Sequence, residues 1–440
     1  MKIVFQQLNS QLFQNVHCAL QDELAGANIR NDKKFLNYSD CDEFRIKRPF
    51  LFAEKEFREL IQAADHIRDA QIAIARKIYD QVGLNRMLDR FGVNREIEPF
   101  IQLDDLFDKT RMIGRFDVIP GREGYKFCEL NVDSPLCCSE DFEFMEEYRR
   151  AIGIAGVAGV GSPFDDTLEL IRSRCGSEKL GKLVILDHSK YKAENGYFPT
   201  SFNLKKIDEK FRGLDVEILT ENEFREYRLK NNCTESLTVV FRLFIYEDIE
   251  GEVGTLGAIF QDSDIFINSF VSEILTSKVW FSELWDPENL KVLDEEQCRS
   301  IKKYIPYTTK VNTHNLDYLL REKDSLVFKE VQSNSGKGVY LGKELTEEKL
   351  AKKLDEMDCS KLVVQQLVEH DPVSIPNDKG CNELYSVVLG LHFSADKYSG
   401  MLVRAGTNSG VINVGSGAGG SSWAIVVDQK EVDQIFDVTH

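Results

Sequence analysis

The chain has 440 residues, of which 42% are hydrophobic, and its 73 acidic and 55 basic side chains give a formal net charge of −18. This length exceeds what one hydrophobic core usually holds and predicts two or three structural units. The acidic balance argues against a nucleic-acid partner and against an anionic membrane surface, because both attract clustered Lys and Arg.

Targeting and redox signals are weak in this sequence. No stretch approaches the roughly 20 apolar residues of a membrane span, and the opening MKIVFQQLNSQLFQ has too short an apolar run for a signal peptide. We therefore expect a cytoplasmic protein with no membrane partner. The ten cysteines show no CxxC pair and no zinc-site spacing, which predicts free buried thiols. A nucleophilic role for Cys137 or Cys138, beside the carboxylate cluster described below, stays open.

The first part of the chain reads as mainly helical over about a hundred residues. Apolar residues recur at spacings of three and four over 53–79 and predict a long amphipathic helix. A strand pair closed by the turn PGREG is predicted over 114–135, and a helix is predicted over 140–156. Glycines then mark a boundary near residue 160.

The second part changes pattern twice. Short β-branched runs alternate with helical ones and predict a small parallel sheet with crossover helices. These runs cover 182–188, 215–219, 237–244 and 264–270. A helix over 271–286 leads into the segment 294–311, and a further helix is predicted over 346–357. The remaining strands look antiparallel and linked by hairpins, at 326–331, 361–368, 384–393, 400–406 and 410–417.

The densest chemical signal is GRFDVIPGREGYKFCELNVDSP (114–135). Residues two apart in a strand share a face, so Arg115 and Asp117 on one strand point the same way as Glu129 and Asn131 on the other. Carboxylate and amide oxygens beside a cation suit Mg²⁺ that carries nucleotide phosphates. The alternative is an ordinary hairpin with a solvated charged face.

A second signal is the strand LVFKEV with Lys329, followed by a small-residue loop at 333–338, here called the flap, and another strand. Its glycines let the backbone approach phosphate, and its N–H groups can cradle anionic oxygens. It is not a P-loop, because the GxxxxGK[ST] spacing is absent and a strand follows. The alternatives are a plain chain reversal and a solvated Lys329.

Two further runs suit a nucleotide. VVQQLVE (363–369) fits a strand that ends at the base, with an acidic side chain near the ribose; an ordinary edge strand is the alternative. LVRAGTNSGVINVGSGAGGSSW (402–423) places Arg404 in one strand and Asn413 in the next. The planar fork of Arg404 suits bidentate bonds to phosphate, whereas a flexible hairpin is the alternative.

The order of these motifs resembles the circularly permuted ATP-grasp ligases related to glutathionylspermidine synthase, in their synthetase domain only. The resemblance runs loosely over 110–425, and ELNVDSP precedes the other motifs, as in the permuted branch. Its most specific parts are RFD with KFCELNVDSP, INSF…SK (267–278) with YIPYT (304–308), FKEVQSNSGKGV, VVQQLV and LVRAGTNSGVINVGSGAGG.

The resemblance implies an α+β or α/β protein: a permuted ATP-grasp fold with a Rossmann-like pre-ATP-grasp unit and an N-terminal helical region. The implied units are a mainly helical region at 1–110, the metal-binding hairpin and helix at 111–160, the Rossmann-like substrate domain at 161–300, and the nucleotide-binding domain at 301–440.

The resemblance also implies roles for single residues. Arg115 would steady the transferred phosphoryl group or the acyl phosphate, and Arg404 would face the reacting carboxylate. Mg²⁺ would be bound by Asp117, Glu129 and Asn131. ATP would be held by Lys310, Lys329, Ser335, Gly336, Lys337, Gly338, Gln366, Leu367, Val368, Glu369 and Asn413.

The implied activity is that of an ATP-dependent, ADP-forming ligase that joins a small carboxylate to an amine through an acyl phosphate, with ATP and Mg²⁺ as cofactors, as a monomer or homodimer. Two alternatives stay open: a carboxylate–thiol ligase that loads an acyl-carrier protein, and an inactive ATP-binding scaffold. The flap lacks the Arg-Glu-Gly of glutathionylspermidine synthase, SSW (421–423) replaces a more charged ending, and no amidase domain is evident. Glutathione and spermidine are therefore not implied as substrates.

Overall fold

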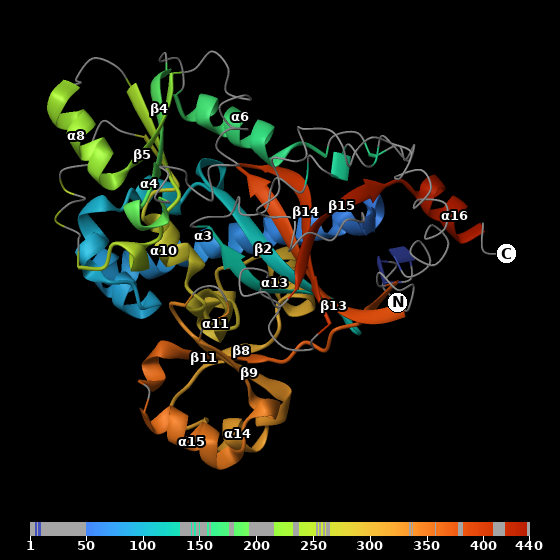
Figure 1. Cartoon of the computed structure of the whole chain (residues 1–440). Helices are drawn as coiled ribbons and strands as arrows, with labels where there is room; N and C mark the ends of the chain where they lie inside the picture. Colours follow the sequence, from blue (N-terminus) through green and yellow to red (C-terminus); the bar gives the residue numbers. More distant parts are fainter. Residues whose placement is uncertain are drawn as a thin grey trace.

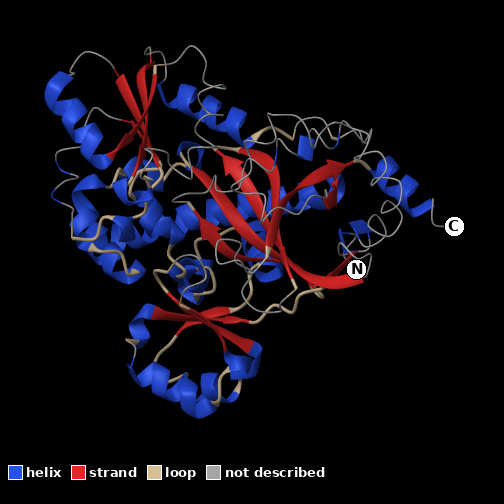
Figure 2. Cartoon of the chain, in the orientation of Figure 1, coloured by secondary structure: helices blue, strands red, loops and turns tan. Residues whose placement is uncertain are grey.

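The computed structural model of the chain is a mixed α/β structure (Figures 1 and 2). Apart from isolated positions, it describes residues 50–132, 160–175, 180–192, 215–231, 237–251, 265–333, 338–356, 358–376, 382–407 and 419–437. The strand predicted over 410–417 lies outside these residues, and the helix predicted over 140–156 lies mostly outside them.

The main sheet has the strand order β1-β15-β14-β13-β2-β3, and β12 also pairs with β13. Its strands are β1 (Phe50–Ala53), β2 (Ile113–Gly121), β3 (Gly124–Asn131), β12 (Val373–Pro376), β13 (Asn382–Ser394), β14 (Lys397–Gly406) and β15 (Gly420–Val427). The predicted hairpin is confirmed as β2 and β3, whose turn is the dipeptide Arg122-Glu123. The edge strand β1 was not predicted; it pairs in parallel with β15 and interrupts the N-terminal region that reads as helical.

One face of the main sheet is covered by α3 (Glu54–Phe91), which Figure 1 shows running behind the strands. Its buried stripe recurs at helical spacing, as predicted. The helix extends past the predicted 53–79: it kinks at Gly83, whose φ of 72° is not helical, and a second helical stretch then runs to Phe91. It ends at Gly92, whose φ of 69° is the left-handed conformation that glycine adopts without strain.

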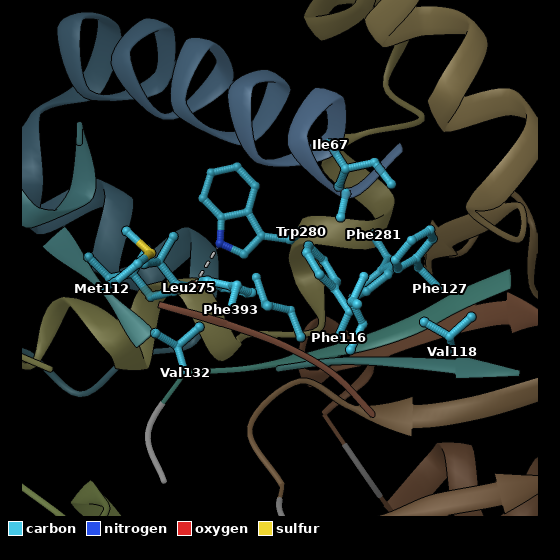
Figure 3. Close-up of a cluster of buried hydrophobic side chains, with 14 of the residues drawn as sticks. Ile67, Met112, Phe116, Val118, Phe127, Val132, Leu275, Trp280, Phe281 and Phe393 are labelled. Atoms are coloured by element: carbon cyan, nitrogen blue, oxygen red, sulfur yellow. Dashed lines mark hydrogen bonds between the residues drawn. The ribbon is translucent and has the colours of Figure 1, made fainter. Parts of the chain in front are cut away.

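Large aromatic side chains fill the space between α3 and the sheet (Figure 3). Phe116 and Phe127 from β2 and β3 pack edge to face, with ring centroids 5.1 Å apart. Trp280 is fully buried against Phe91, and its indole N–H donates to the carbonyl of Ile274 at 2.7 Å. A buried indole needs such an acceptor, so this bond fixes the ring in the core.

A second sheet is wholly parallel, with the order β5-β4-β6-β7, as the alternating pattern predicted. Its strands are β4 (Leu180–Asp187), β5 (Val216–Thr220), β6 (Leu237–Arg242) and β7 (Ile265–Ile267). Helix α6 (Pro163–Cys175) buries Phe164 and Ile171 against this sheet, and its Thr167 lies beside Ser394 of β13. Helix α8 (Glu221–Asn231) follows β5.

A third sheet, with the order β10-β9-β11-β8, is antiparallel and forms the lower lobe in Figure 1. Its strands are β8 (Thr308–Lys310), β9 (Leu326–Glu330), β10 (Val339–Leu341) and β11 (Leu362–Gln366). Helices α14 (Leu316–Arg321) and α15 (Glu347–Glu356) cover its apolar face. The prediction of antiparallel strands is confirmed. The strands predicted over 326–331 and 361–368, however, pair with each other in this third sheet, whereas those over 384–406 belong to the main sheet. The apolar residues of β9 and β11 form a separate core under α14 and α15.

Short helices connect the sheets. The prediction of a single helix over 271–286 is wrong, because two helices form there, α10 (Val271–Thr276) and α11 (Val279–Glu283). The break lies at Ser277, whose ψ of 127° is not helical and whose hydroxyl donates to the Phe91 carbonyl. The remaining helices are α4 (Leu103–Leu106), α10 (Val271–Thr276), α11 (Val279–Glu283), α12 (Pro287–Leu290), α13 (Glu295–Tyr304), α16 (Gln429–Asp437) and the 3₁₀ turns η3 (Arg95–Phe100), η4 (Lys109–Arg111), η5 (Ser189–Tyr191), η6 (Tyr246–Asp248), η7 (Lys323–Ser325), η8 (Gly342–Glu344) and η9 (Cys359–Lys361). None of the helices that the structure describes is both long and apolar enough to cross a bilayer.

Candidate functional site

The site begins at the β2–β3 hairpin, on the face of the main sheet opposite to α3. Arg115 lies opposite Asn131 and Asp117 lies opposite Glu129 in the ladder. Directly opposed residues project to the same face, so the structure brings the four predicted side chains together. Phe116, between Arg115 and Asp117, points to the other face and into the core under α3.

A β-bulge shapes this hairpin. Asp117 pairs with Glu129 and Val118 pairs with Phe127, which leaves Cys128 as the extra residue on β3. Its carbonyl, unpaired in the ladder, accepts a hydrogen bond from Lys329 Nζ at 3.0 Å. Burial raises the pKa of the Cys128 thiol to about 11, so this thiol stays protonated at neutral pH. The bulge therefore provides an oxygen acceptor for a lysine of the third sheet.

Asp117 joins two arginines. Its carboxylate lies 3.1 Å from Arg115 Nε and 2.6 Å from Arg404 Nη2 on β14. Burial acts to raise the pKa of Asp117, but the adjacent charges of Arg404 and Arg115 outweigh it and hold the pKa below its ordinary value. The ionised carboxylate thus holds both guanidinium groups on one face of the sheet.

Gly390 on β13 makes room for this arrangement. It lies opposite Asp117, and a Cβ at this position would come within 2.6 Å of Arg115 Cδ and 3.1 Å of Leu402 Cβ. The Arg115 side chain therefore crosses β13 where no side chain stands.

Replacing Gly390 with Ala is expected to displace Arg115 and to destabilise the protein by about 1–3 kcal/mol, the usual cost of overpacking. Urea unfolding measures the stability, and the activity proposed below should fall more than stability alone explains. Gly254, where an added Cβ has no neighbour within 4 Å, is the matched control for Gly→Ala. Equal stability and activity of the Gly390 variant and the wild type would contradict this account.

Lys329 reaches the site from β9. Its Nζ donates to Gln365 Oε1 at 2.7 Å as well as to the Cys128 carbonyl, and Gln365 Nε2 in turn donates to Thr308 Oγ1. Burial lowers the pKa of Lys329, partly offset by nearby Cys128 and Glu129. The side chain therefore points inward, where a lysine of an apolar strand is expected to pair with an anion.

Lys278 is a site residue that the pattern analysis missed. It is buried in the link between α10 and α11, 3.2 Å from Glu129 Oε1, and its Nζ also donates to the carbonyl of Ser333. The prediction of one unbroken helix over 271–286 gave this lysine no particular position. The only sequence signal was its place at the end of the INSF…SK segment.

The flap is flanked by β9 and β10, a hairpin, as predicted. Gly336 and Gly338 have φ of 72° and 65°, and a Cβ on Gly338 would lie 2.8 Å from Glu330 Cδ. Both positions therefore need glycine. Ser335, Lys337 and Asn413 lie outside the described residues, so their roles stay predictions.

The end of β11 runs beside the hairpin turn. Gln366 and Leu367 are held by backbone bonds to the carbonyls of Tyr307 and Ser325, both at 2.8 Å. Val368 lies next to Gly121, and the exposed Glu369 pairs with the exposed Arg122 at 2.8 Å. The four residues predicted to border adenine thus form a fixed segment at one edge of the site.

Lys310 on β8 shares a row with Lys329, since both pair with Val363 of β11. Its Nζ lies 2.8 Å from Glu283 Oε1, and Glu283 is also bound by Arg90 of α3. Burial acts to raise the pKa of Glu283, but Arg90 and Lys310 hold it below its ordinary value. This ion cluster connects α3, α11 and the third sheet.

The Glu283 carboxylate should stabilise the fold in a pH-dependent way. Its folded pKa is depressed, so its contribution is complete above the unfolded pKa of about 4.3 and is lost as the pH falls through the folded value. Glu283→Gln should lower the free energy of unfolding by about 1–2 kcal/mol at neutral pH, since it takes the buried carboxylate away from Arg90 and Lys310, whose partial exposure to solvent moderates the loss. Urea titrations at a series of pH values test this, because the difference from the wild type should shrink below about pH 4. A difference that is constant with pH would contradict it.

Three comparisons with known proteins bear on the fold. No protein-family model and no curated protein sequence matches the chain. Among solved structures, the chain is similar to a glutathione synthetase-like effector from Globodera pallida in its apo form, with a TM-score of 0.56 and 12% identity over 86% of this chain and 89% of that one. A putative gamma-glutamylcysteine synthetase from Methylobacillus flagellatus matches with a TM-score of 0.38 and 10% identity, over 81% and 88% of the two chains, which is too weak to compare folds. The chain therefore has a mixed α/β fold similar to that of a glutathione synthetase-like protein.

Proposed function

We propose that this protein is an ATP-dependent, ADP-forming ligase that joins a carboxylate to an amine. The observation that carries the proposal is the convergence of distant segments on one site. In the early hairpin, Asp117 and Glu129 stand opposite each other; Lys329 of the third sheet bonds the carbonyl of Cys128, next to Glu129, and Arg404 of β14 pairs with Asp117. Hard oxygen ligands and several cations in one place suit a magnesium–nucleotide complex.

The oxygen atoms of Glu129 and Asn131 fit Mg²⁺ that is carried by a nucleotide. Within the described part of the chain, no group of three or more His, Cys, Asp or Glu side chains could hold a metal ion by itself. Mg²⁺ in phosphate-transfer sites does not need such a group, because one or two carboxylates suffice when phosphate and water supply the other ligands. Asp117, whose carboxylate contacts both arginines, is the third proposed ligand. Bound Mg²⁺ would neutralise part of the phosphate charge.

The nucleotide would lie between the main sheet and the third sheet. Lys329 and Lys278 would meet the phosphates, under the flap that includes Gly336 and Gly338. Lys310 and the segment Gln366–Glu369 would lie at the adenosine end. We also propose that the order of segments is a circular permutation of the ATP-grasp arrangement, and that the parallel sheet β5-β4-β6-β7 is a Rossmann-like unit that binds substrate.

The chemistry would have two steps. A carboxylate oxygen attacks the γ-phosphorus of ATP, which forms an acyl phosphate and releases ADP; an amine then attacks the acyl carbon, and inorganic phosphate leaves. In the first step one anion approaches another, and Arg115, Arg404 and Lys329 would offset that repulsion. Closure of the flap would exclude the water that hydrolyses an acyl phosphate.

The test is a screen for ADP release with small carboxylates, dipeptides included, against amines, with hydroxylamine as a trap that converts an acyl phosphate to a hydroxamate. Carboxylate-dependent ADP release with hydroxamate formation, lost in Lys329→Met, is the expected result. ATP binding without carboxylate-dependent ADP release would indicate a scaffold protein instead. ADP release that depends on an acyl-carrier protein and not on any amine would favour thioester formation.

A further inference from the structure

His392 of β13 is a buried histidine on the face that carries the site. It lies directly opposite Arg115 in the ladder, so its side chain projects to the same face as Arg115. Its relative exposure is 1%, and its ring packs against Trp423 with centroids 5.1 Å apart. Within the part of the chain that the structure describes, neither ring nitrogen has a hydrogen-bond partner.

Such an arrangement is costly for a protein that binds nothing there. A neutral imidazole has one N–H donor and one acceptor nitrogen, and leaving a buried polar group unsatisfied costs about 1–3 kcal/mol. Burial, with the charge of Arg115 as a further cause, holds the pKa of His392 well below its ordinary value. The ring is therefore neutral, and a phenylalanine would fill the same space against Trp423 without the cost.

A second unsatisfied donor lies in the same row. Asn131 is opposite Arg115 on the other side, in β3, and its Nδ2 is also buried without a partner. In the ladder, Arg115 thus stands between two residues with unused side-chain nitrogen atoms, and its own side chain runs past Gly390 to Asp117 on the same face. An Asn131 amide can bind a metal through its oxygen while its Nδ2 donates elsewhere, so this use is compatible with the proposed Mg²⁺ role.

We propose that the row Asn131–Arg115–His392 is an oxyanion subsite in which His392 binds the ligand directly through a neutral N–H. We assign the oxyanion as the carboxylate of the acyl donor, and only this identity of the ligand rests on the proposed reaction. Donors from three residues in one row suit the two oxygen atoms of a carboxylate, which would accept hydrogen bonds from the His392 N–H and from Asn131 Nδ2.

The experiment measures oxyanion binding by the whole protein in the presence of Mg²⁺ and ADP, with isothermal titration of acetate and, separately, of inorganic phosphate. His392→Phe keeps a ring against Trp423 but removes both nitrogens. His392→Gln keeps an N–H donor. The control is His66→Phe on α3, across the sheet, whose Nδ1 lies 2.8 Å from Ser300 Oγ.

We expect His392→Phe to weaken binding of at least one of the two oxyanions by roughly five- to tenfold, the worth of one hydrogen bond. His392→Gln should recover part of the loss, His66→Phe should bind as the wild type does, and the thermal midpoint of His392→Phe should equal or exceed that of the wild type. The probe with the larger loss identifies the group that occupies the subsite.

Two results would overturn the subsite: equal affinities of wild type and His392→Phe for both probes, or no measurable binding of either probe to the wild type. The proposed function fails separately. If the screen finds no carboxylate that releases ADP while phosphate or acetate binding still depends on His392, the subsite stands and the ligase does not.

Discussion

Glu129→Gln is expected to lower carboxylate-dependent ADP formation roughly a thousandfold, because a metal-bound carboxylate contributes several kcal/mol to phosphate transfer. The substitution keeps the size of the side chain and removes its charge. Initial rates over a range of Mg²⁺ concentrations measure the effect, and part of the lost rate should return at high Mg²⁺. The Lys278 ammonium, 3.2 Å from Glu129 Oε1, loses its carboxylate in this variant, so urea unfolding is measured beside the kinetics.

Glu123→Gln is the matched control, since Glu123 lies exposed in the turn of the same hairpin and should leave the rate unchanged. Turnover of Glu129→Gln near the wild-type rate, with the same dependence on Mg²⁺, would remove Glu129 from the metal site. A loss of rate that follows a loss of folded protein would make Glu129 a structural residue.

Asp117→Asn should destabilise the protein by about 3 kcal/mol and abolish the activity, because it leaves the charges of Arg115 and Arg404 facing each other in a buried place. Urea unfolding gives the free energy. The second substitution Arg404→Met in this background removes one of the two cations and should restore part of the stability but none of the activity. A double-mutant cycle then gives the coupling energy between Asp117 and Arg404.

An Asp117→Asn variant as stable as the wild type would show that the carboxylate does not hold the two arginines together. Equal destabilisation by Asp117→Asn alone and in the Arg404→Met background would show the same. Either result would leave the Mg²⁺ role of Asp117 as a separate question, answered by the Mg²⁺ dependence of its rate.

The parts of the fold that follow from local pattern were predictable. The two-residue alternation around Arg115 and Glu129 predicts a hairpin with one polar face, and the register confirms which side chains share it. The helical periodicity of α3 and the alternating strands of the parallel sheet were predictable for the same reason: each is specified by residues close in sequence.

Features specified by distant contacts were not predictable. The pairing of β1 with β15 leaves no local mark, and the break at Ser277 depends on a bond to the Phe91 carbonyl. Lys278 and His392 were missed because their sequence neighbours look like an ordinary helix and an ordinary strand. Only the register of β13 with β2 shows that His392 stands beside Arg115.

The parallel pairing of β1 with β15 also constrains how the protein is made. Phe50 leaves the ribosome early, yet its ladder partner, Ala424, is among the last residues of the main sheet to be synthesised. Contacts this far apart slow folding and leave hydrophobic surface exposed in the meantime. During translation the edge of β14 that will receive β15 stays open, so the nascent chain should depend on chaperones until residue 427 has emerged.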